Sequence, residues 1–370
     1  MVLVTGGAGF IGSHLADGLL SRGHSVRVLD SLDAQVHGKG ADWPAYLSPD
    51  VERIRGDIRD PEAVRRALEG VDAVCHQAAA VGVGQSMYEI ERYVSVNSLG
   101  AAVLLEGVLA VRDRVERLVV ASSMSIYGEG LYRDAEGSRI APGLRPDAQL
   151  EARRWELVDA QGRPLEPVAT PETKPLRPTS VYAVTKRDHE ELFLSVGSAY
   201  RIPTVALRYF NVYGSRQALS NPYTGVAAIF SARLLNRKPP LVNEDGLQTR
   251  DFVHVSDIVQ ANLRALDCPA DGGRVYNVGT GQATSIRRIA ELLAERLGLE
   301  IECEVTQRFR AGDIRHCIAS IDLAREELGF EPQVPFEQGI DEVIAWVRTH
   351  EAMDRVEDAA RELAQRGLTR

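Results

Sequence analysis

The stretch VLVTGGAGFIG, residues 2–12, decides the fold of this 370-residue chain. Its first three residues form a short apolar run typical of a buried strand, and Gly6, Gly9 and Gly12 follow at once. The first glycine allows a tight turn, the second lets backbone N–H groups approach a pyrophosphate, and the third lets a helix pack on the strand. Residues 11–22 are the expected helix, with its positive N-terminal end at the pyrophosphate.

An acidic residue occupies the position that discriminates between NAD and NADP in folds of this kind. Residues 25–29 are expected to form the second strand, and Asp30 follows directly. A carboxylate about twenty residues after the glycines suits the ribose hydroxyls of NAD and repels the additional phosphate of NADP. The sequence therefore predicts NAD as the cofactor. The alternative is a glycine turn that binds nothing.

Strand and helix signals alternate through the first half of the chain. This rhythm predicts an α/β fold, a Rossmann-type doubly wound parallel sheet, whose ligands lie beyond the carboxyl ends of the strands. The expected strands are residues 51–55, 72–76, 118–121 and 204–208, and the expected helices are residues 61–68, 88–109 and 181–198.

A loop-rich excursion and a second domain follow. Residues 129–177 are rich in glycine and proline, so we expect loops with a small hairpin, either a plain surface insertion or a substrate lid or subunit contact. The expected organisation is a Rossmann domain at 1–210, a smaller mixed α/β substrate domain mainly at 211–349, with about 250–266 returning to the Rossmann core, and a helical tail at 350–370. In the second half, we expect strands at 248–255 and 275–278 and helices at 226–236, 257–266, 285–297 and 336–349.

Composition and charge exclude several classes of partner. The net charge of −9 gives no basic footprint, so nucleic acid is not expected. No apolar run approaches the roughly twenty residues that span a bilayer, and the first strand leaves no room for a signal peptide, so we expect no membrane association and a cytoplasmic location. The four cysteines form no C-x-x-C pair, which favours buried thiols in a reducing compartment and no metal site.

A tyrosine and a lysine supply the expected chemistry. Tyr182 and Lys186 are four residues apart, so they share one face of a helix. A phenol titrates near about 10 and is a poor base at neutral pH, but a nearby ammonium favours the phenolate and lowers the pKa. Tyr182 can then accept the proton of a hydroxyl group while hydride leaves the same carbon for NAD. Ser123, after the expected strand 118–121, supplies a hydroxyl to position the reacting oxygen.

These residues belong to a wider pattern. Over residues 2–347, the chain resembles the extended short-chain dehydrogenases/reductases, in particular the NAD-dependent epimerase/dehydratase family that acts on nucleotide sugars. The motifs that carry the resemblance are TGGAGFIG (5–12), GDI (56–58), HQAA (76–79), Asn97, SSMSIYG (122–128), YAVTK (182–186), RYFNVYG (208–214), RDFVHV (250–255) and YNVGTG (276–281).

The resemblance implies a role for each matching residue. The implied catalytic residues are Ser123, Tyr182 and Lys186. The implied cofactor-binding residues are Gly6, Gly9, Phe10, Ile11, Gly12, Asp30, Asp57, Ile58, Ala78, Ala79, Ala80, Asn97, Ser122, Tyr182, Lys186 and Tyr209. The implied residues for a nucleotide-diphosphate sugar are Val83, Ser123, Ser125, Tyr182, Asn211, Arg250, Arg310 and Asp313. The two arginines would grip the diphosphate; plain surface charge is the alternative for them. A homodimer through helices 88–109 and 181–198 is also implied.

The residues after Ser123 discriminate among the reactions of such a family, which fold alone does not. By resemblance, 4,6-dehydratases carry an Asp-Glu pair there, and decarboxylases tend to carry a glutamate at the second position. Met124 and Ser125 occupy these positions here, and neither can do that work. The remaining set favours 4-epimerisation, an isomerase reaction in which C4 is oxidised to a 4-keto sugar and hydride returns to the opposite face.

The substrate is read from a less specific part of the resemblance. Residues 214–226 and the excursion look most like those of dTDP-L-rhamnose 4-epimerases, which interconvert dTDP-L-rhamnose and dTDP-6-deoxy-L-talose. Members with this excursion often carry paired cysteines in it, whereas residues 129–177 contain none. UDP-glucose or UDP-glucuronate 4-epimerase is the rival interpretation. An NAD(P)H-dependent 4-ketosugar reductase is disfavoured by Asp30, and a non-catalytic NAD sensor by the presence of Tyr182 and Lys186.

Overall fold

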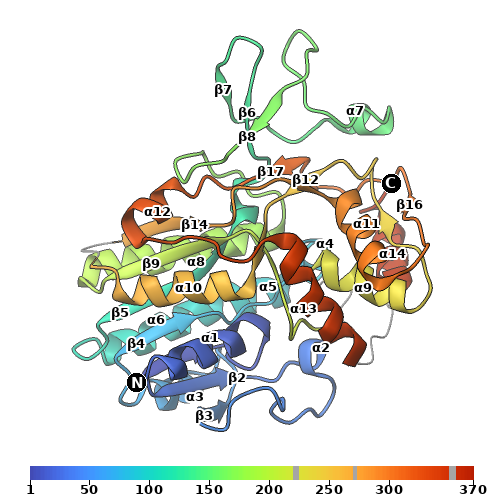
Figure 1. Cartoon of the computed structure of the whole chain (residues 1–370). Helices are drawn as coiled ribbons and strands as arrows, with labels where there is room; N and C mark the ends of the chain where they lie inside the picture. Colours follow the sequence, from blue (N-terminus) through green and yellow to red (C-terminus); the bar gives the residue numbers. More distant parts are fainter. Residues whose placement is uncertain (220–224, 270–272, 350–355) are drawn as a thin grey trace.

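A parallel sheet forms the centre of the computed structural model, which describes residues 1–219, 225–269, 273–349 and 356–370. Among these residues the sheet has seven strands in the order β3-β2-β1-β4-β5-β9-β14 (Figure 1). The chain runs outward from β1 to β3 and then returns to the other side of β1, so a switch point lies between β1 and β4. The strands are β1 (Val2–Thr5), β2 (Val26–Asp30), β3 (Glu52–Arg55), β4 (Ala73–His76), β5 (Arg117–Ser123), β9 (Thr204–Tyr209) and β14 (Gly273–Val278).

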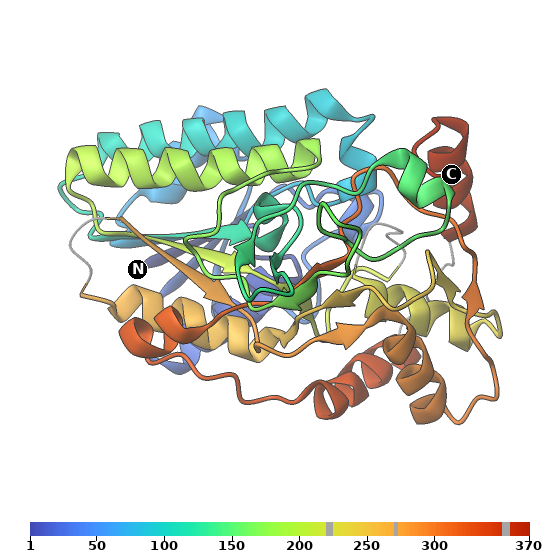
Figure 2. The same ribbon diagram turned by 90° about the horizontal axis from the view of Figure 1, so that it is seen from above.

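Helices cover both faces of this sheet (Figure 2). Successive strand residues point to opposite faces, so Val2 and Val4 join one apolar core while Leu3 joins the other. The two cores make the strands apolar throughout, as expected for a parallel sheet buried on both sides. The first face carries α1 (Phe10–Ser21), α10 (Val255–Asp267) and α12 (Asp322–Leu328), and the second carries α3 (Pro61–Leu68), α6 (Gly100–Ala110) and α8 (Val181–Tyr200).

The long helix predicted at 88–109 runs over Ile90–Ala110 and contains a π-helical turn. It consists of α5 (Ile90–Tyr93), a π-helical turn (Val94–Leu99) and α6. Asn97, within the π turn, accepts a hydrogen bond from the Ala80 N–H at 2.8 Å and donates to the Thr185 hydroxyl at 2.9 Å. Such turns are frequent at functional sites, and this one points a buried amide at the loop after β4.

The same stretch corrects an expectation about apolar runs. Ile90–Ala110 is long and apolar enough to cross a membrane by length and composition, with a mean hydropathy of 1.5. In the structure it is a covering helix of the sheet, because Leu104, Leu105 and Val108 are buried in the core shared with α3 and α8.

The smaller domain packs three helices around its own apolar core. These are α9 (Val226–Leu235), α11 (Ile286–Leu297) and α13 (Phe336–Thr349). The strand predicted at 248–255 is divided at Asp251, a buried residue whose carboxylate accepts from the Thr280 and Gly281 N–H groups. The short strands are β10 (Asn211–Tyr213) with β13 (Phe252–His254), β11 (Leu241–Val242) with β16 (Glu304–Val305), and β12 (Thr249–Arg250) between β15 (Thr284–Ser285) and β17 (His316–Cys317).

The return of the chain to the central sheet is longer than predicted. Besides α10, it includes β14, which pairs in parallel with β9 at the edge of the sheet. The expected range of about 250–266 therefore omits a whole strand, because the short segment 275–278 carries no sequence signal that tells one sheet from another.

The excursion has its own small sheet. Strands β6 (Leu131–Arg133), β7 (Arg139–Ile140) and β8 (Glu166–Val168) pair in the order β7-β6-β8, and α7 (Asp147–Glu151) follows β7. It rises above the sheet and the smaller domain in Figure 1. The predicted hairpin is thus one part of a three-stranded unit.

The remaining helices of the described part of the chain are short. They are α2 (Ala34–His37), α4 (Val83–Ser86), a 3-10 turn (Met124–Tyr127) and α14 (Val356–Gln365). In the tail, Leu363 of α14 is buried, and the Arg366 guanidinium lies 4.2 Å from the ring centre of Tyr88. Residues 350–355 of the predicted tail lie outside the described residues. The thiols of Cys75, Cys268, Cys303 and Cys317 are free, and all but Cys303 are buried.

Candidate active site

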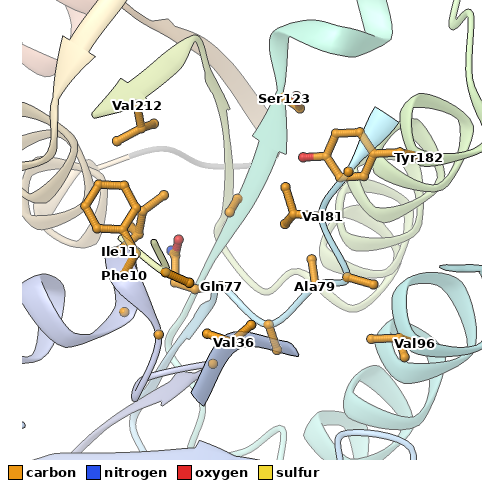
Figure 3. A pocket seen from close by; sticks show the side chains of 18 of the residues that line it. Phe10, Ile11, Val36, Gln77, Ala79, Val81, Val96, Ser123, Tyr182 and Val212 are labelled. Carbon is orange, nitrogen blue, oxygen red and sulfur yellow. The ribbon is translucent and has the colours of Figure 1, made fainter. Parts of the chain in front are cut away.

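A cleft of about 540 Å³ opens at the carboxyl edge of the central sheet. Its lining includes the glycine loop after β1, the ends of β2, β4, β5 and β9, and the first turns of α8. Figure 3 shows Phe10 and Ile11 on one side and the Tyr182 phenol projecting into the cleft on the side of Ser123. The cleft therefore lies at the switch point where ligands of such sheets bind.

The glycine loop is shaped for close approach of a ligand to its backbone. Gly6 has a φ of +67°, and a Cβ on Gly12 would lie 2.2 Å from the Gly6 carbonyl oxygen. Gly9 is the N-cap of α1, and no side chain caps that end of the helix. The N-terminal N–H groups of α1 are thus left to a ligand, and the helix dipole favours a negatively charged one.

Asp30 closes the loop from the other side. Its carboxylate accepts hydrogen bonds from the Ala8 N–H at 3.0 Å and from the Leu32 N–H at 2.9 Å. It lines the cleft at the end of β2. The loop that a Cβ would fill, the uncapped helix and this carboxylate together fit the pyrophosphate and ribose of NAD.

Replacing Asp30 by alanine tests this fit. We expect the Asp30→Ala variant to lose about tenfold or more of its preference for NAD over NADP, because a charged hydrogen-bond acceptor contributes about 1.5–3 kcal/mol. Calorimetric titration of both dinucleotides measures this preference. Asp113→Asn is the control, since that carboxylate is fully exposed and does not line the cleft. An unchanged preference in Asp30→Ala would remove Asp30 from the ribose site.

Three hydroxyl and amine groups meet at the far side of the cleft. Ser122 and Ser123 are the last residues of β5, rather than following it, and Ser123 accepts hydrogen bonds from the Ser125 hydroxyl at 2.9 Å and the Ser125 N–H at 3.2 Å. Tyr182 is hydrogen-bonded to Ser123. Lys186 follows one turn later on α8, whose N-cap Ser180 accepts from the Ala183 N–H at 3.1 Å.

The electrostatics of this group differ from the expectation. Burial raises the pKa of Tyr182 above its ordinary value, and the hydrogen bond from Ser123 only partly offsets this. Burial also lowers the pKa of Lys186 to about 7, although the negative charge of Glu190 acts to raise it. The predicted lowering of the Tyr182 pKa by Lys186 is not found, because the only cause that opposes desolvation is the hydrogen bond with Ser123. A positive charge brought into the cleft would act in the predicted direction.

Most residues implied by the resemblance lie together. Those lining the cleft are Gly6, Gly9, Phe10, Ile11, Gly12, Asp30, Asp57, Ile58, Ala78, Ala79, Ala80, Val83, Ser122, Ser123, Ser125, Tyr182, Lys186, Tyr209 and Asn211. Asn211 adds an amide oxygen that is buried and has no hydrogen-bond partner within the described part of the chain. Such an acceptor in a cleft indicates a ligand donor or water.

Four implied residues do not line the cleft. Asn97 lies behind it and holds Ala80, as described above. Arg250 donates to the Thr249, Ile314 and Arg315 carbonyls at 2.7–2.9 Å, so a diphosphate would have to draw this guanidinium away from the backbone. Arg310 and Asp313 are paired with each other at 2.8 Å. The predicted grip of both arginines on a diphosphate is not formed in this arrangement.

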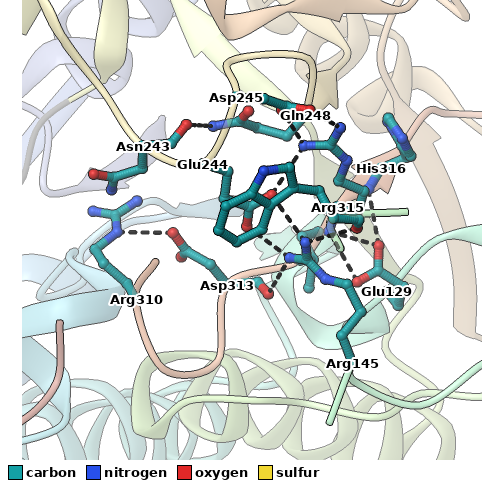
Figure 4. Close-up of polar contacts among 12 residues, drawn as sticks. Glu129, Arg145, Asn243, Glu244, Asp245, Gln248, Arg310, Asp313, Arg315 and His316 are labelled. Atoms are coloured by element: carbon teal, nitrogen blue, oxygen red, sulfur yellow. Dashed lines mark hydrogen bonds and ion pairs between the residues drawn. The ribbon is translucent and has the colours of Figure 1, made fainter. Parts of the chain in front are cut away.

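Asp313 borders a buried network of charges that the sequence did not predict (Figure 4). Arg145 of the excursion forms two hydrogen bonds with Glu244 at 2.8 and 2.9 Å, and Arg315 bonds the same carboxylate at 2.9 Å. Arg315 also pairs with Glu156 and Asp245. The side chains of Arg315 and Glu244 are 0% and 4% exposed. This network joins the excursion to the smaller domain.

The fold and the cleft define a class of protein. A parallel sheet in this order, a glycine loop at its switch point and a Tyr-x-x-x-Lys helix beside a strand-end serine are the parts of an NAD-dependent short-chain dehydrogenase/reductase. The chain belongs to the NAD dependent epimerase/dehydratase family, whose model matches residues 2–147 and 158–279.

Named relatives narrow the comparison. The chain is 36% identical over 348 residues to a dTDP-L-rhamnose 4-epimerase from Burkholderia thailandensis, which covers 94% of each chain. It is 30% identical to a putative UDP-glucose 4-epimerase from Methanocaldococcus jannaschii, over 95% of this chain and 99% of the relative.

Solved structures agree with these relatives. A UDP-glucose 4-epimerase from Thermotoga maritima with UDP-glucose gives a TM-score of 0.76 at 30% identity, over 94% of this chain and 98% of that one. A UDP-glucuronic acid 4-epimerase from Bacillus cereus with UDP-glucuronic acid and NAD gives 0.75 at 27% identity, over 94% and 99%. The predictions of the family, the fold class, an isomerase and NAD as cofactor are confirmed.

Proposed function

We propose that the protein is an NAD-dependent nucleotide-sugar 4-epimerase that interconverts dTDP-L-rhamnose and dTDP-6-deoxy-L-talose. The observation that carries the reaction is that Ser123, Tyr182 and Lys186 all line the cleft, whereas the carboxylate of Glu190 behind them does not. Among the described residues, the carboxylates lining the cleft are Asp30, Asp33 and Asp57, all near the ends of β2 and β3. Elimination across C5 and C6 therefore has no acid–base pair here, whereas epimerisation needs only one proton acceptor.

We assign each proton a place from the hydrogen bonds of the site. Ser123 accepts both hydrogen bonds from Ser125, so its own hydrogen bonds Tyr182 and can turn to the oxygen on sugar C4 when a sugar binds. Tyr182 takes the proton from that oxygen and later returns it. When bound, NAD supplies the reversible acceptor for the hydride of C4. Return of that hydride to the opposite face of the 4-keto sugar would complete an epimerisation with no net redox change.

The cofactor and substrate residues are part of this proposal. The glycine loop and Asp30 hold the pyrophosphate and ribose, Asp57 and Ile58 flank the adenine, and residues 78–80 line the remainder. Asn211 and Val83 are assigned to the sugar nucleotide, with a Rossmann domain and a smaller substrate domain on either side. Its four free thiols suit a reducing compartment such as the cytoplasm.

The sugar is supported by one relative and opposed by others. The dTDP-L-rhamnose 4-epimerase is the more similar of the two named relatives, but the solved neighbours bind UDP-glucose and UDP-glucuronic acid. Residues 220–224 of the segment 214–226 lie outside the described residues, and the excursion lacks cysteine. UDP-glucose or UDP-glucuronate is accordingly the second candidate.

Proton NMR of the sugar H4 couplings tests the proposal. The purified protein is incubated without reductant with dTDP-L-rhamnose, and in parallel with UDP-glucose and UDP-glucuronate. We expect the 6-deoxy-talose spectrum in the first tube. If only a UDP-sugar is epimerised, the proposed reaction stands and the proposed substrate is wrong. No change in any tube, with consumption of NADH or NADPH when a 4-keto sugar is supplied, would replace the epimerase by the reductase.

A homodimer is proposed on the helices beside the cleft. The π turn exposes Leu99 at 51% and α8 exposes Val184 at 52%, and these two elements contact each other. A shared apolar face of this kind is stabilised by a second copy. Sedimentation should give a dimer for the native chain and a monomer for Leu99→Arg. If the native chain and Leu99→Arg form dimers of equal stability, Leu99 does not belong to the interface.

A further inference from the structure

A buried histidine contacts the lysine of the active-site helix from behind. His189 follows Lys186 by one turn on α8, and its Nδ1 lies 3.3 Å from the Lys186 Nζ. Its Nε2 lies 2.5 Å from the Asn97 carbonyl oxygen in the π turn. Both side chains are buried, so no solvent competes for these bonds.

The partners fix which ring nitrogen carries hydrogen. A carbonyl oxygen only accepts hydrogen bonds, so the Nε2 of His189 must be the donor to Asn97. Burial, together with the charge of Lys186 and the neighbouring His76, holds the pKa of His189 well below its usual range. The ring is therefore neutral, and its Nδ1 is left as an acceptor for the Lys186 ammonium.

This arrangement determines where the lysine points its remaining hydrogen. The ammonium has three donors; one goes to the Ala121 carbonyl and one to His189. The third is left for the cleft, which Lys186 lines.

The other groups around the lysine hold hydrogen bonds that lead away from it, apart from the buried His76 Nε2, which has no hydrogen-bond partner among the described residues. His76 on β4 is bonded to the Thr5 hydroxyl at 2.7 Å, and its ring centre lies 5.0 Å from that of His189. Glu190, next on α8, accepts from the Arg208 guanidinium at 2.5 Å and from the Ser122 hydroxyl at 2.6 Å. The hydrogen bonds that lead from Lys186 through His189 end at a carbonyl, which takes up no proton.

We propose that His189 is a positioning residue that aims the Lys186 ammonium at the cleft and ends the proton path behind it. The proton held by Tyr182 then returns to the sugar oxygen it came from, which, resting on the proposed function, suits a reaction without net oxidation or reduction. No motif in the sequence marks His189, although its spacing of three from Lys186 places it on the same face of the helix.

Titration of Tyr182 tests this role without any sugar. The phenolate absorbance of the NAD-bound protein is followed from about pH 6 to about pH 11, and the same titration of a Tyr182→Phe background is subtracted. Burial leaves Lys186 uncharged where Tyr182 titrates, so the lysine acts there as a hydrogen-bond donor. In His189→Leu the amine loses one of the two acceptors that hold it and donates less well to the phenolate, so the midpoint should rise by about one pKa unit. His189→Gln restores an acceptor and a donor, and its midpoint should return toward that of the native chain.

Two controls separate positioning from packing. Phe193→Leu shortens another buried residue of α8, which stacks on His76 with ring centres 5.1 Å apart, and it should leave the midpoint unchanged. An unchanged midpoint in His189→Leu, or an equal shift in Phe193→Leu, would overturn the inference. Nitrogen-15 NMR of labelled histidine in the native chain is independent of folding defects: we expect the Nε2–H tautomer of His189, and an Nδ1–H tautomer would also overturn it. The His189 inference can fail in these measurements while the protein still epimerises a sugar nucleotide. Conversely, the measurements can support the inference when no sugar is turned over.

Discussion

The Tyr182→Phe variant is expected to lose turnover of its sugar nucleotide by about 10²- to 10⁴-fold while it still binds NAD. The substitution removes the only atom of this side chain that can exchange a proton, and the ring continues to fill the same space beside Ser123. The loss should therefore appear in kcat, with little change in KM. Coupled NMR or chromatographic assay of product, beside the stoichiometry of bound NAD, measures both parts.

The matched control is Tyr200→Phe at the other end of the same helix. Tyr200 is 47% exposed, so loss of its hydroxyl should leave turnover and folding as they are. Substantial activity in Tyr182→Phe would mean that another group accepts the proton. Ser123 would then be the next residue to replace, since its hydroxyl is hydrogen-bonded to Tyr182.

Glu244→Ala is expected to lower the free energy of unfolding by about 3–5 kcal/mol, the usual effect of removing one member of a buried ion pair. The Arg145 side chain is 1% exposed, and Glu244 is its only ion-pair partner among the described residues. The variant leaves that guanidinium buried without its ion-pair partner and with only the more distant charge of Glu129, while Arg315 keeps Glu156 and Asp245. Urea unfolding followed by circular dichroism measures the change.

An exposed pair provides the comparison for this variant. Glu62 and Arg65 are bonded at 2.7 Å on the surface of α3, and Glu62→Ala should leave the unfolding midpoint within error. Because Arg145 belongs to the excursion, Glu244→Ala should also speed proteolysis within residues 129–177. A native midpoint for Glu244→Ala would show that Arg145 recruits another carboxylate on relaxation.

Local signals in the sequence were sufficient for most of the sheet. Apolar runs and helix caps predict the strands around the cleft and the helices α3 and α13 to within a few residues. For example, Asp60 is the N-cap of α3, and its carboxylate accepts a hydrogen bond from the Glu62 N–H. The π-helical turn at 94–99 was not predictable in this way. It depends on Asn97 bonding Ala80 and Thr185, which lie 17 residues before it and 88 after it.

The site divides along the same line. Residues that act through backbone shape or lie at a strand end, such as Gly12, Asp30 and Ser123, line the cleft as predicted. The direction of long side chains was decided by distant partners: Arg250 turns to the Ile314 carbonyl 64 residues away. The pair of Arg145 and Glu244, separated by 99 residues, has no local signature. The roles of all these residues remain predictions until variants are assayed.

The apolar stretch Ile90–Ala110 has a consequence for how the protein is made. Its cover on one side is α8, which ends at Tyr200, about 90 residues later in the chain. At synthesis rates of about 5–20 residues per second, this helix waits roughly 5 to 18 s outside the ribosome before that cover exists. A nascent chain that displays so hydrophobic a helix is a client for chaperones, and its soluble yield in a foreign host should rise with the supply of chaperones and not with the strength of the promoter.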